Sequence, residues 1–165
     1  MIRLKSKNEL AIMAGAGTIA FILDRLSKIW ALAHLTQGRM APFLPGLLQF
    51  NLTMNTGAAF SLGRDQAPLM TAVACLYTVG FLVWGLVRLY KAERPAILER
   101  IGAGLIVGAS CGNLYERFTQ GRVTDFLEFS FFSFPVFNVA DALIDTGVVL
   151  IIIQFLFLEG KTKDA

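Results

Sequence analysis

The chain has 165 residues, of which 55% are hydrophobic and only 16% are charged, and its formal net charge is +3. Soluble domains carry about 25% charged residues, so this composition excludes an ordinary soluble domain and indicates a single membrane domain over residues 1–165. The small, dispersed positive charge excludes nucleic-acid binding, because no basic stripe with interleaved aromatic residues is present.

Four apolar segments, at residues 10–35, 67–89, 97–115 and 136–158, approach the about 20 residues that cross a bilayer. The first follows a basic start and resembles a secretory signal peptide. Asp24, Arg25 and Lys28 separate its apolar core from the small residues of a cleavage site, so we expect an uncleaved first span. The expected fold is therefore mainly α, an integral membrane bundle of four transmembrane helices.

The Lys and Arg residues near the ends of the spans predict the orientation. If the N-terminus is cytoplasmic, nine of the 15 lie on the cytoplasmic side and six on the other. We therefore expect both termini in the cytoplasm. The two long loops, at about 36–66 and 116–135, are then on the outer face.

The first of these loops contains a strictly alternating segment, residues 48–55. Its apolar side consists of Leu48, Phe50, Leu52 and Met54, and its polar side of Gln49, Asn51, Thr53 and Asn55. This period of two predicts a half-buried strand. The apolar stretch before it is broken by Pro42 and Pro45, which favours an interfacial helix or loop, and the Phe-rich second loop could supply further strands. We expect a small extracytoplasmic β-sheet above the bundle.

The cysteines and the histidine carry no metal-ligand spacing. Cys75 and Cys111 fall inside apolar segments, and His34 has no partner pattern. We interpret the cysteines as small buried hydrophobes. We expect no metal, no disulfide and no organic cofactor.

Two aspartates, Asp125 and Asp141, lie where an outer loop meets an apolar helix. A carboxylate at membrane depth is costly unless it is paired or hydrated. Two carboxylates that meet share a proton, so that one acts as a base and the other as an acid. The pair predicts the machinery of an aspartic protease placed in a membrane. Asp145, one turn after Asp141, is expected to be a protonated, hydrogen-bonded carboxyl outside the pair.

Three further groups have a structural and a functional interpretation. Asn55 and Gly57, directly after the predicted strand, are either a turn or a clamp for a substrate backbone. Asn113, Glu116 and Arg117 share one helical face, on which the arginine either snorkels to the interface or belongs to a site.

Asp24 and Lys28 stand four apart and form either a structural ion pair or part of the same site. Gly104, Gly108 and Gly112, also four apart, predict close helix packing in lipid.

Five blocks of the chain together resemble the bacterial lipoprotein signal peptidase family, signal peptidase II. The blocks occur in the family's order and span about residues 10–158: Asp24-Arg-Leu-Ser-Lys28, Asn55-Thr-Gly-Ala-Ala-Phe-Ser61, Gly112-Asn-Leu-Tyr-Glu-Arg117, Val123-Thr-Asp-Phe126 and Phe137-Asn-Val-Ala-Asp141.

The resemblance implies an aspartic endopeptidase of the bacterial inner membrane, with its active site near the outer, periplasmic face. Such enzymes remove signal peptides from prolipoproteins before a diacylglyceryl-modified cysteine. By position, Asp125 and Asp141 would be the catalytic pair. The residues that would bind substrate or brace the site are Asn55, Gly57, Asn113, Arg117, Asn138, Asp24 and Lys28. The partners expected are prolipoproteins and membrane lipid, and we expect a monomer.

One position departs from the family's third block, which usually reads Gly-Asn-x-x-Asp-Arg. Glu116 stands in place of that Asp, so a tight local hydrogen bond could be lost and the geometry around Arg117 changed. Two alternatives stay open at this stage. One is a non-enzymatic four-helix transporter or channel that uses its intramembrane acids to relay protons. The other is an inactive family member that binds lipopeptides.

Overall fold

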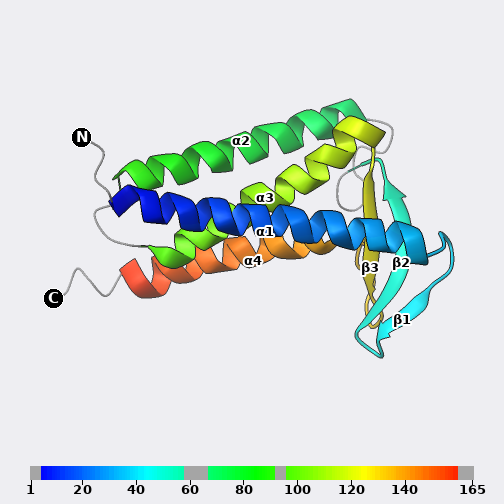
Figure 1. Cartoon of the computed structure of the whole chain (residues 1–165). Helices are drawn as coiled ribbons and strands as arrows, with labels where there is room; N and C mark the ends of the chain where they lie inside the picture. The colour runs from blue at the N-terminus through cyan, green and yellow to red at the C-terminus, as the bar shows by residue number, and fades with distance from the viewer. Residues whose placement is uncertain (1–4, 58–66, 92–95, 160–165) are drawn as a thin grey trace.

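A computed structural model describes residues 5–57, 67–91 and 96–159 of the protein. Within them, the helices are α1 (Lys5–His34), α2 (Ala67–Lys91), α3 (Ile97–Gln120) and α4 (Val139–Ile153), and α4 continues into a short π-helix, η2 (Gln154–Glu159). The strands are β1 (Ala41–Leu44), β2 (Leu48–Asn55) and β3 (Val123–Phe129). The helices form an elongated bundle, and the sheet covers the end of it at which α1 finishes and α4 begins (Figure 1).

Three of the described helices are long and apolar enough to cross a membrane, over Lys7–His34, Pro68–Lys91 and Val139–Phe157. Their large apolar side chains point away from the bundle: Leu26, Leu76 and Leu156 are 59%, 76% and 66% exposed. Such continuous apolar surfaces are stable in lipid and not in water. The mainly helical chain is therefore an integral membrane protein.

Helix α3 lies at the centre of the bundle and contacts α1, α2 and α4. Gly104 and Gly108 face α1: a Cβ at Gly104 would clash with the Met13 carbonyl, and a Cβ at Gly108 would clash with the Gly17 carbonyl. The close packing predicted from the glycine spacing is confirmed. Because α3 is enclosed, the polar residues on it, such as Glu116, are buried among the other helices rather than exposed to lipid.

Buried ion pairs join three helices at the end of the bundle away from the sheet. Arg100 Nε lies 3.0 Å from Glu9 Oε2, and Arg100 Nη1 lies 2.9 Å from Glu99 Oε1. Arg88 Nε of α2 lies 2.8 Å from the same Glu99 oxygen. Glu99 and Arg100 are almost fully buried, so this pairing offsets the cost of removing both charges from water.

The sheet is antiparallel with the order β1-β2-β3. Strand β2 has the bounds that the alternation predicts, and the Phe-rich second loop supplies β3. From the apolar side of β2, Leu52 packs with Ala31 of α1 and Phe126 of β3 in a buried cluster. This cluster attaches the sheet to the end of the helix bundle.

The interpretation of the Pro-broken stretch as an interfacial helix or loop is wrong for residues 41–44, which form the edge strand β1. Pro42 pairs with Gln49, and the register shifts between Pro42 and Leu44. An edge strand tolerates proline because only one side of the strand needs ladder hydrogen bonds. The turn that follows has Gly46 at φ 77°, a conformation in which glycine has no steric penalty.

Candidate active site

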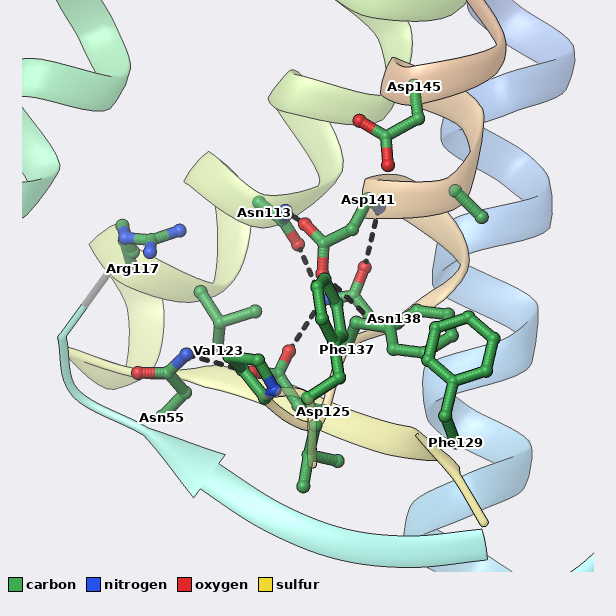
Figure 2. Close-up of a pocket in the computed structure, with 14 residues that line it drawn as sticks. Asn55, Asn113, Arg117, Val123, Asp125, Phe129, Phe137, Asn138, Asp141 and Asp145 are labelled. Atoms are coloured by element: carbon green, nitrogen blue, oxygen red, sulfur yellow. Dashed lines mark hydrogen bonds between the residues drawn. The ribbon is translucent and has the colours of Figure 1, made fainter. Parts of the chain in front are cut away.

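Asp125 lies in the middle of β3, with its side chain directed toward the start of α4 (Figure 2). Its Oδ2 accepts a hydrogen bond from Asn55 Nδ2 at 2.8 Å, and its Oδ1 accepts one from Asn138 Nδ2 at 2.7 Å. Strand pairing places Thr53 opposite Asp125, so Asn55, two residues further, projects from the same face of the sheet. Asp125 is only 3% exposed.

Asp141 lies in the first turn of α4 and forms a capping box with Asn138, the N-cap residue. Asn138 N donates to Asp141 Oδ2 at 3.0 Å, and Asp141 N donates to Asn138 Oδ1 at 3.1 Å. Asn113 Nδ2 of α3 donates to the other carboxylate oxygen at 3.1 Å. Asn138 therefore donates to both carboxylates, to that of Asp125 from its side-chain amide and to that of Asp141 from its backbone N–H (Figure 2).

A buried network of charges lies behind the asparagines. Asn113 Oδ1 accepts hydrogen bonds from Lys28 Nζ at 2.6 Å and from Asn138 Nδ2 at 3.2 Å. Lys28 Nζ also lies 2.8 Å from Asp24 Oδ1 and 3.4 Å from Glu116 Oε2. Lys28, Asp24 and Glu116 are each 0% exposed. The ammonium group thus connects the end of α1 to the asparagine that contacts Asp141.

The Glu116 carboxylate accepts two hydrogen bonds from a nearby residue. The loss of a tight local hydrogen bond, considered above for Glu at this position, therefore does not occur. Thr124 donates to its carboxylate twice, from the backbone N at 2.8 Å and from Oγ1 at 2.9 Å. Arg25 Nη1 lies 3.4 Å from the same carboxylate. The Glu116 side chain spans the distance from α3 to the residue next to Asp125 in β3.

Arg117 is directed to the chain segment after β2. Its Nη2 donates to the carbonyl of Gly57 at 3.1 Å, and Gly57 N donates to Asn55 Oδ1 at 2.9 Å. Helix α3 ends at Gln120, one turn after this arginine, and the next residue, Gly121, takes the left-handed conformation at φ 68° and donates its N–H to the Arg117 carbonyl. The remainder of the Asn55 block, residues 58–61, lies outside the described residues.

The two aspartates line a cavity of about 540 Å³. Its polar lining comes from the residues above, and its apolar lining comes largely from the segment between β3 and α4. The full lining is Asn55, Asn113, Arg117, Val123, Asp125, Phe129, Phe134, Pro135, Val136, Phe137, Asn138, Asp141, Ala142 and Asp145. A cavity of this size, mostly apolar with a few converging polar groups, is typical of a small ligand or peptide site.

The pKa of Asp125 is raised from 3.8 to about 7, first by burial and second by the negative charge of the nearby Asp141. The hydrogen bonds from Asn55 and Asn138 act against this rise, because they stabilise the ionised form. Asp125 therefore holds a proton up to near-neutral pH while lying close to a second carboxyl group. That is the protonation pattern of an acid and base pair.

Asp145 differs from its expected state. It lines the same cavity one turn beyond Asp141, but it is exposed and makes no hydrogen bond to any residue in the described part of the chain. The expectation of a hydrogen-bonded carboxyl at Asp145 is therefore wrong. Among the residues that the structure describes, no group of three or more His, Cys, Asp or Glu is arranged to hold a metal ion.

The structure brings together all the candidate residues named from the sequence: Asp24, Lys28, Asn55, Gly57, Asn113, Arg117, Asp125, Asn138 and Asp141. Sequence reasoning also singles out Arg25 as a candidate site residue, and its guanidinium contacts Glu116. It missed Thr124, which donates to Glu116, and the Phe side chains of the cavity wall. Thr124 had a usable signal, because a polar residue next to Asp125 on a strand must project to the opposite face.

These features define an integral membrane protein whose helical bundle carries a pair of aspartates in the wall of a cavity at one end. A family model described as Signal peptidase (SPase) II matches residues 17–157. The chain belongs to the signal peptidase II family.

Individual relatives and a solved structure agree with this assignment. The chain is 38% identical over 147 residues to the lipoprotein signal peptidase of Gloeobacter violaceus, covering 89% of this chain and 83% of the relative. It is 34% identical over 133 residues to that of Streptococcus pyogenes serotype M6, covering 79% and 84%. A solved structure described as a bacterial membrane enzyme has the same fold, with a TM-score of 0.77 over 93% of this chain and 92% of that chain at 23% identity.

Proposed function

We propose that this member of the signal peptidase II family is an aspartic endopeptidase of the bacterial inner membrane. It removes the signal peptide from prolipoproteins by cutting before a diacylglyceryl-modified cysteine. The observation that carries the proposal is the bridging of Asp125 and Asp141 by Asn138 at the wall of one cavity. Two carboxyl groups that bond the same asparagine, one of which keeps its proton near neutral pH, match the needs of acid–base peptide hydrolysis.

In the proposed mechanism, Asp125 is the acid and Asp141 is the base. Asp141 takes a proton from a bound water, whose oxygen attacks the scissile carbonyl carbon. Asp125 donates a hydrogen bond and then its proton to the carbonyl oxygen, which stabilises the developing charge. When the C–N bond breaks, Asp141 passes its proton to the leaving amine of the cysteine, and Asp125 recovers a proton from the intermediate. No step uses a metal or a cofactor.

The surrounding polar residues fix the positions of the two aspartates and of the substrate relative to each other. Asn113 and Asn138 restrict the Asp141 carboxylate, and Lys28 restricts Asn113 in turn. Arg117 donates to the Gly57 carbonyl, and its other N–H groups, which bond no residue in the described part of the chain, donate to a substrate backbone. Preorganised donors of this kind lower the barrier because they need no reorganisation during the reaction.

The proposed topology has four spans within one membrane domain, with α3 as the span enclosed by the others. Both termini lie in the cytoplasm, and the sheet and the cavity lie at the outer face. This orientation places the acid pair at the outer end of α4, where the apolar segment of a signal peptide would leave the bilayer. The substrate's lipid chains then remain in the membrane beside the bundle, and the enzyme acts as a monomer.

The experiment is cleavage of a purified diacylated prolipoprotein by the purified protein in detergent or lipid. Asp125→Asn and Asp141→Asn are each expected to lower the cleavage rate by at least about 1,000-fold, since both members of the pair are needed. Glu128→Gln is the matched control: it makes the same change in the same strand, at a residue that bonds only Gln49 and Asn51 in the described chain, and should cleave at the wild-type rate.

Cleavage by either Asn variant at the wild-type rate would overturn the assignment of the pair. A wild-type protein that binds the lipopeptide without cleaving it would instead identify an inactive binding protein. Ion flux in proteoliposomes without cleavage would identify a transporter or channel.

A further inference from the structure

Asp145 is the one carboxylate of the cavity that the proposed chemistry does not use. It lies on α4 four residues after Asp141, and Figure 2 shows both side chains on the same side of the helix. It is exposed, and no hydrogen bond joins it to the described residues. A carboxylate within a membrane span is costly to keep without a partner. Its exposure to the cavity indicates that the partner comes from the ligand.

The direction of α4 determines which part of a substrate passes Asp145. Helix α4 runs from the sheet toward the far end of the bundle (Figure 1), so Asp145 lies about 6 Å deeper than Asp141, at 1.5 Å per residue. The signal peptide precedes the scissile bond and occupies the membrane side of the pair, whereas the mature protein leaves on the outer side. An extended substrate advances about 3.3 Å per residue, so about two residues cover the depth from Asp141 to Asp145. Asp145 therefore lies beside the second residue before the scissile bond.

The surroundings of Asp145 suit an apolar peptide with an occasional polar side chain. Tyr77 of α2 lies close enough for the Asp145 charge to act on its hydroxyl. Beyond Tyr77, a second cavity of about 500 Å³ between α2 and α4 is lined by Tyr77, Gly80, Phe81, Trp84 and Ile151. Tyr77 therefore lies both near Asp145 of the polar cavity and in the wall of the apolar one. An apolar segment that fills the second cavity brings its last residues past Asp145.

We propose that Asp145 is a specificity-determining residue whose carboxylate accepts a hydrogen bond from a Ser or Thr side chain among the three signal-peptide residues before the scissile bond. The inference rests on the proposed function and adds a preference to it. The same negative charge repels a carboxylate at that place in the substrate. Sites that pair with a substrate hydroxyl discriminate strongly against analogues without one, because the protein group is then left desolvated and unpaired.

The experiment measures kcat/KM for diacylated substrate peptides that carry Ser, Ala or Asp at each of the three positions before the cysteine. For the wild-type protein, Ser is expected to exceed Ala by about tenfold at one position, the usual size of a hydrogen bond to a charged group. Asp145→Val should remove this preference, mainly through KM. Asp145→Asn should retain part of it and should cleave the Asp peptide at least about tenfold faster than the wild-type protein does.

Thr146→Val is the control, since Thr146 is exposed on α4 but does not line the cavity, and it should leave every ratio unchanged. If Asp145→Val has the same Ser-to-Ala ratio of kcat/KM as the wild-type protein at all three substrate positions, the inference is overturned while the proposed function stands. If the wild-type protein cleaves none of the diacylated peptides, the proposed function fails and the inference fails with it. A purely structural role of Asp145 would lower all rates together and leave the Ser-to-Ala ratio unchanged, which also contradicts the inference.

Discussion

Asn138 and Asp141 are joined by two reciprocal hydrogen bonds at the start of α4, each from a backbone N–H to a side-chain oxygen: Asn138 N to Asp141 Oδ2 and Asp141 N to Asn138 Oδ1. The same Asn138 donates its amide group to Asp125. The residue that begins the helix is therefore also the residue that sets the position of both carboxyl groups. The Asn138 side chain both caps helix α4 and bonds Asp125. A substitution that keeps the cap but loses the bond to Asp125 therefore separates the two contributions, to stability and to activity.

Asn138→Ser and Asn138→Ala are expected to have different effects on stability and similar effects on activity. Serine caps a helix nearly as well as asparagine, whereas alanine costs about 1 kcal/mol. Neither side chain reaches Asp125, so kcat/KM should fall about 10- to 100-fold in both. Thermal unfolding in detergent and peptide cleavage measure the two effects. A Ser variant with wild-type kcat/KM would show that the bond to Asp125 is dispensable.

The pH dependence of cleavage should report the proton on Asp125. Because its pKa is raised to about 7, the acid is present below pH 7 and is lost above it. We expect kcat/KM to fall about tenfold per pH unit above pH 7. A rate that stays constant up to pH 9 would contradict this assignment of the acid.

The same proton should make stability depend on pH, but in the window below pH 7. A pKa raised from 3.8 to about 7 means that the folded protein binds this proton more tightly than the unfolded chain. The free energy of unfolding should therefore decrease as the pH rises from about 4 to about 7, by at most about 4 kcal/mol. Asp125→Asn has no such proton, so its stability should vary less over this range. Parallel melting curves of the two proteins provide the comparison.

Glu116→Asp, which restores the residue usual in the family, should destabilise this chain. The shorter side chain cannot keep both hydrogen bonds from Thr124 and the contact with Lys28 at their present distances. We expect a loss of about 1–3 kcal/mol, the cost of leaving a buried polar group unpaired. Thr124→Val, which removes one donor only, should cost less. Equal or higher stability of Glu116→Asp would show that the helix and strand readjust freely.

Gly112→Ala should displace the Asp24–Lys28 ion pair that supports the site. A Cβ there would meet the Asp24 carboxylate, which pairs with Lys28. The variant is expected to lose about 1–3 kcal/mol of stability, as for other overpacked cores, and some cleavage activity. Gly15→Ala on α1 is the control, because nothing lies within 4 Å of its Cβ position. That change should be neutral or should stabilise the helix by up to about 1 kcal/mol. Equal melting temperatures of the two variants would contradict the prediction.

Glu99→Gln should lower stability without altering the chemistry. The glutamate holds Arg88 and Arg100 at the end of the bundle away from the sheet, and removing one partner of a buried pair costs about 3–5 kcal/mol. The unfolding temperature in detergent should drop, while the cleavage rate per folded molecule stays at the wild-type value. A changed rate in the folded fraction would indicate coupling between the two ends of the bundle.

Local patterns were sufficient for part of the structure. Strict alternation predicted β2 with its observed bounds, because a strand with one buried face requires a period of two. The glycine spacing on α3 predicted its close approach to α1, because four residues complete about one turn. The Pro-broken segment was misread, since proline excludes helix and central strand but allows an edge strand such as β1.

The sequence by itself determined the membrane character, the order of the helices and the identity of the polar blocks, because these depend on composition and on spacing along the chain. Only the tertiary structure decided how the blocks meet. Lys28 and Asn113 are 85 positions apart in the chain, yet Lys28 Nζ lies 2.6 Å from Asn113 Oδ1. The carboxylate of Glu116 accepts its hydrogen bonds from Thr124 on strand β3 and not from its own helix. Contacts of this kind depend on how helices and sheet pack in three dimensions, which no local period encodes. The same packing leaves Asp145 exposed to the cavity of Asp125 and Asp141 instead of bonded within the bundle.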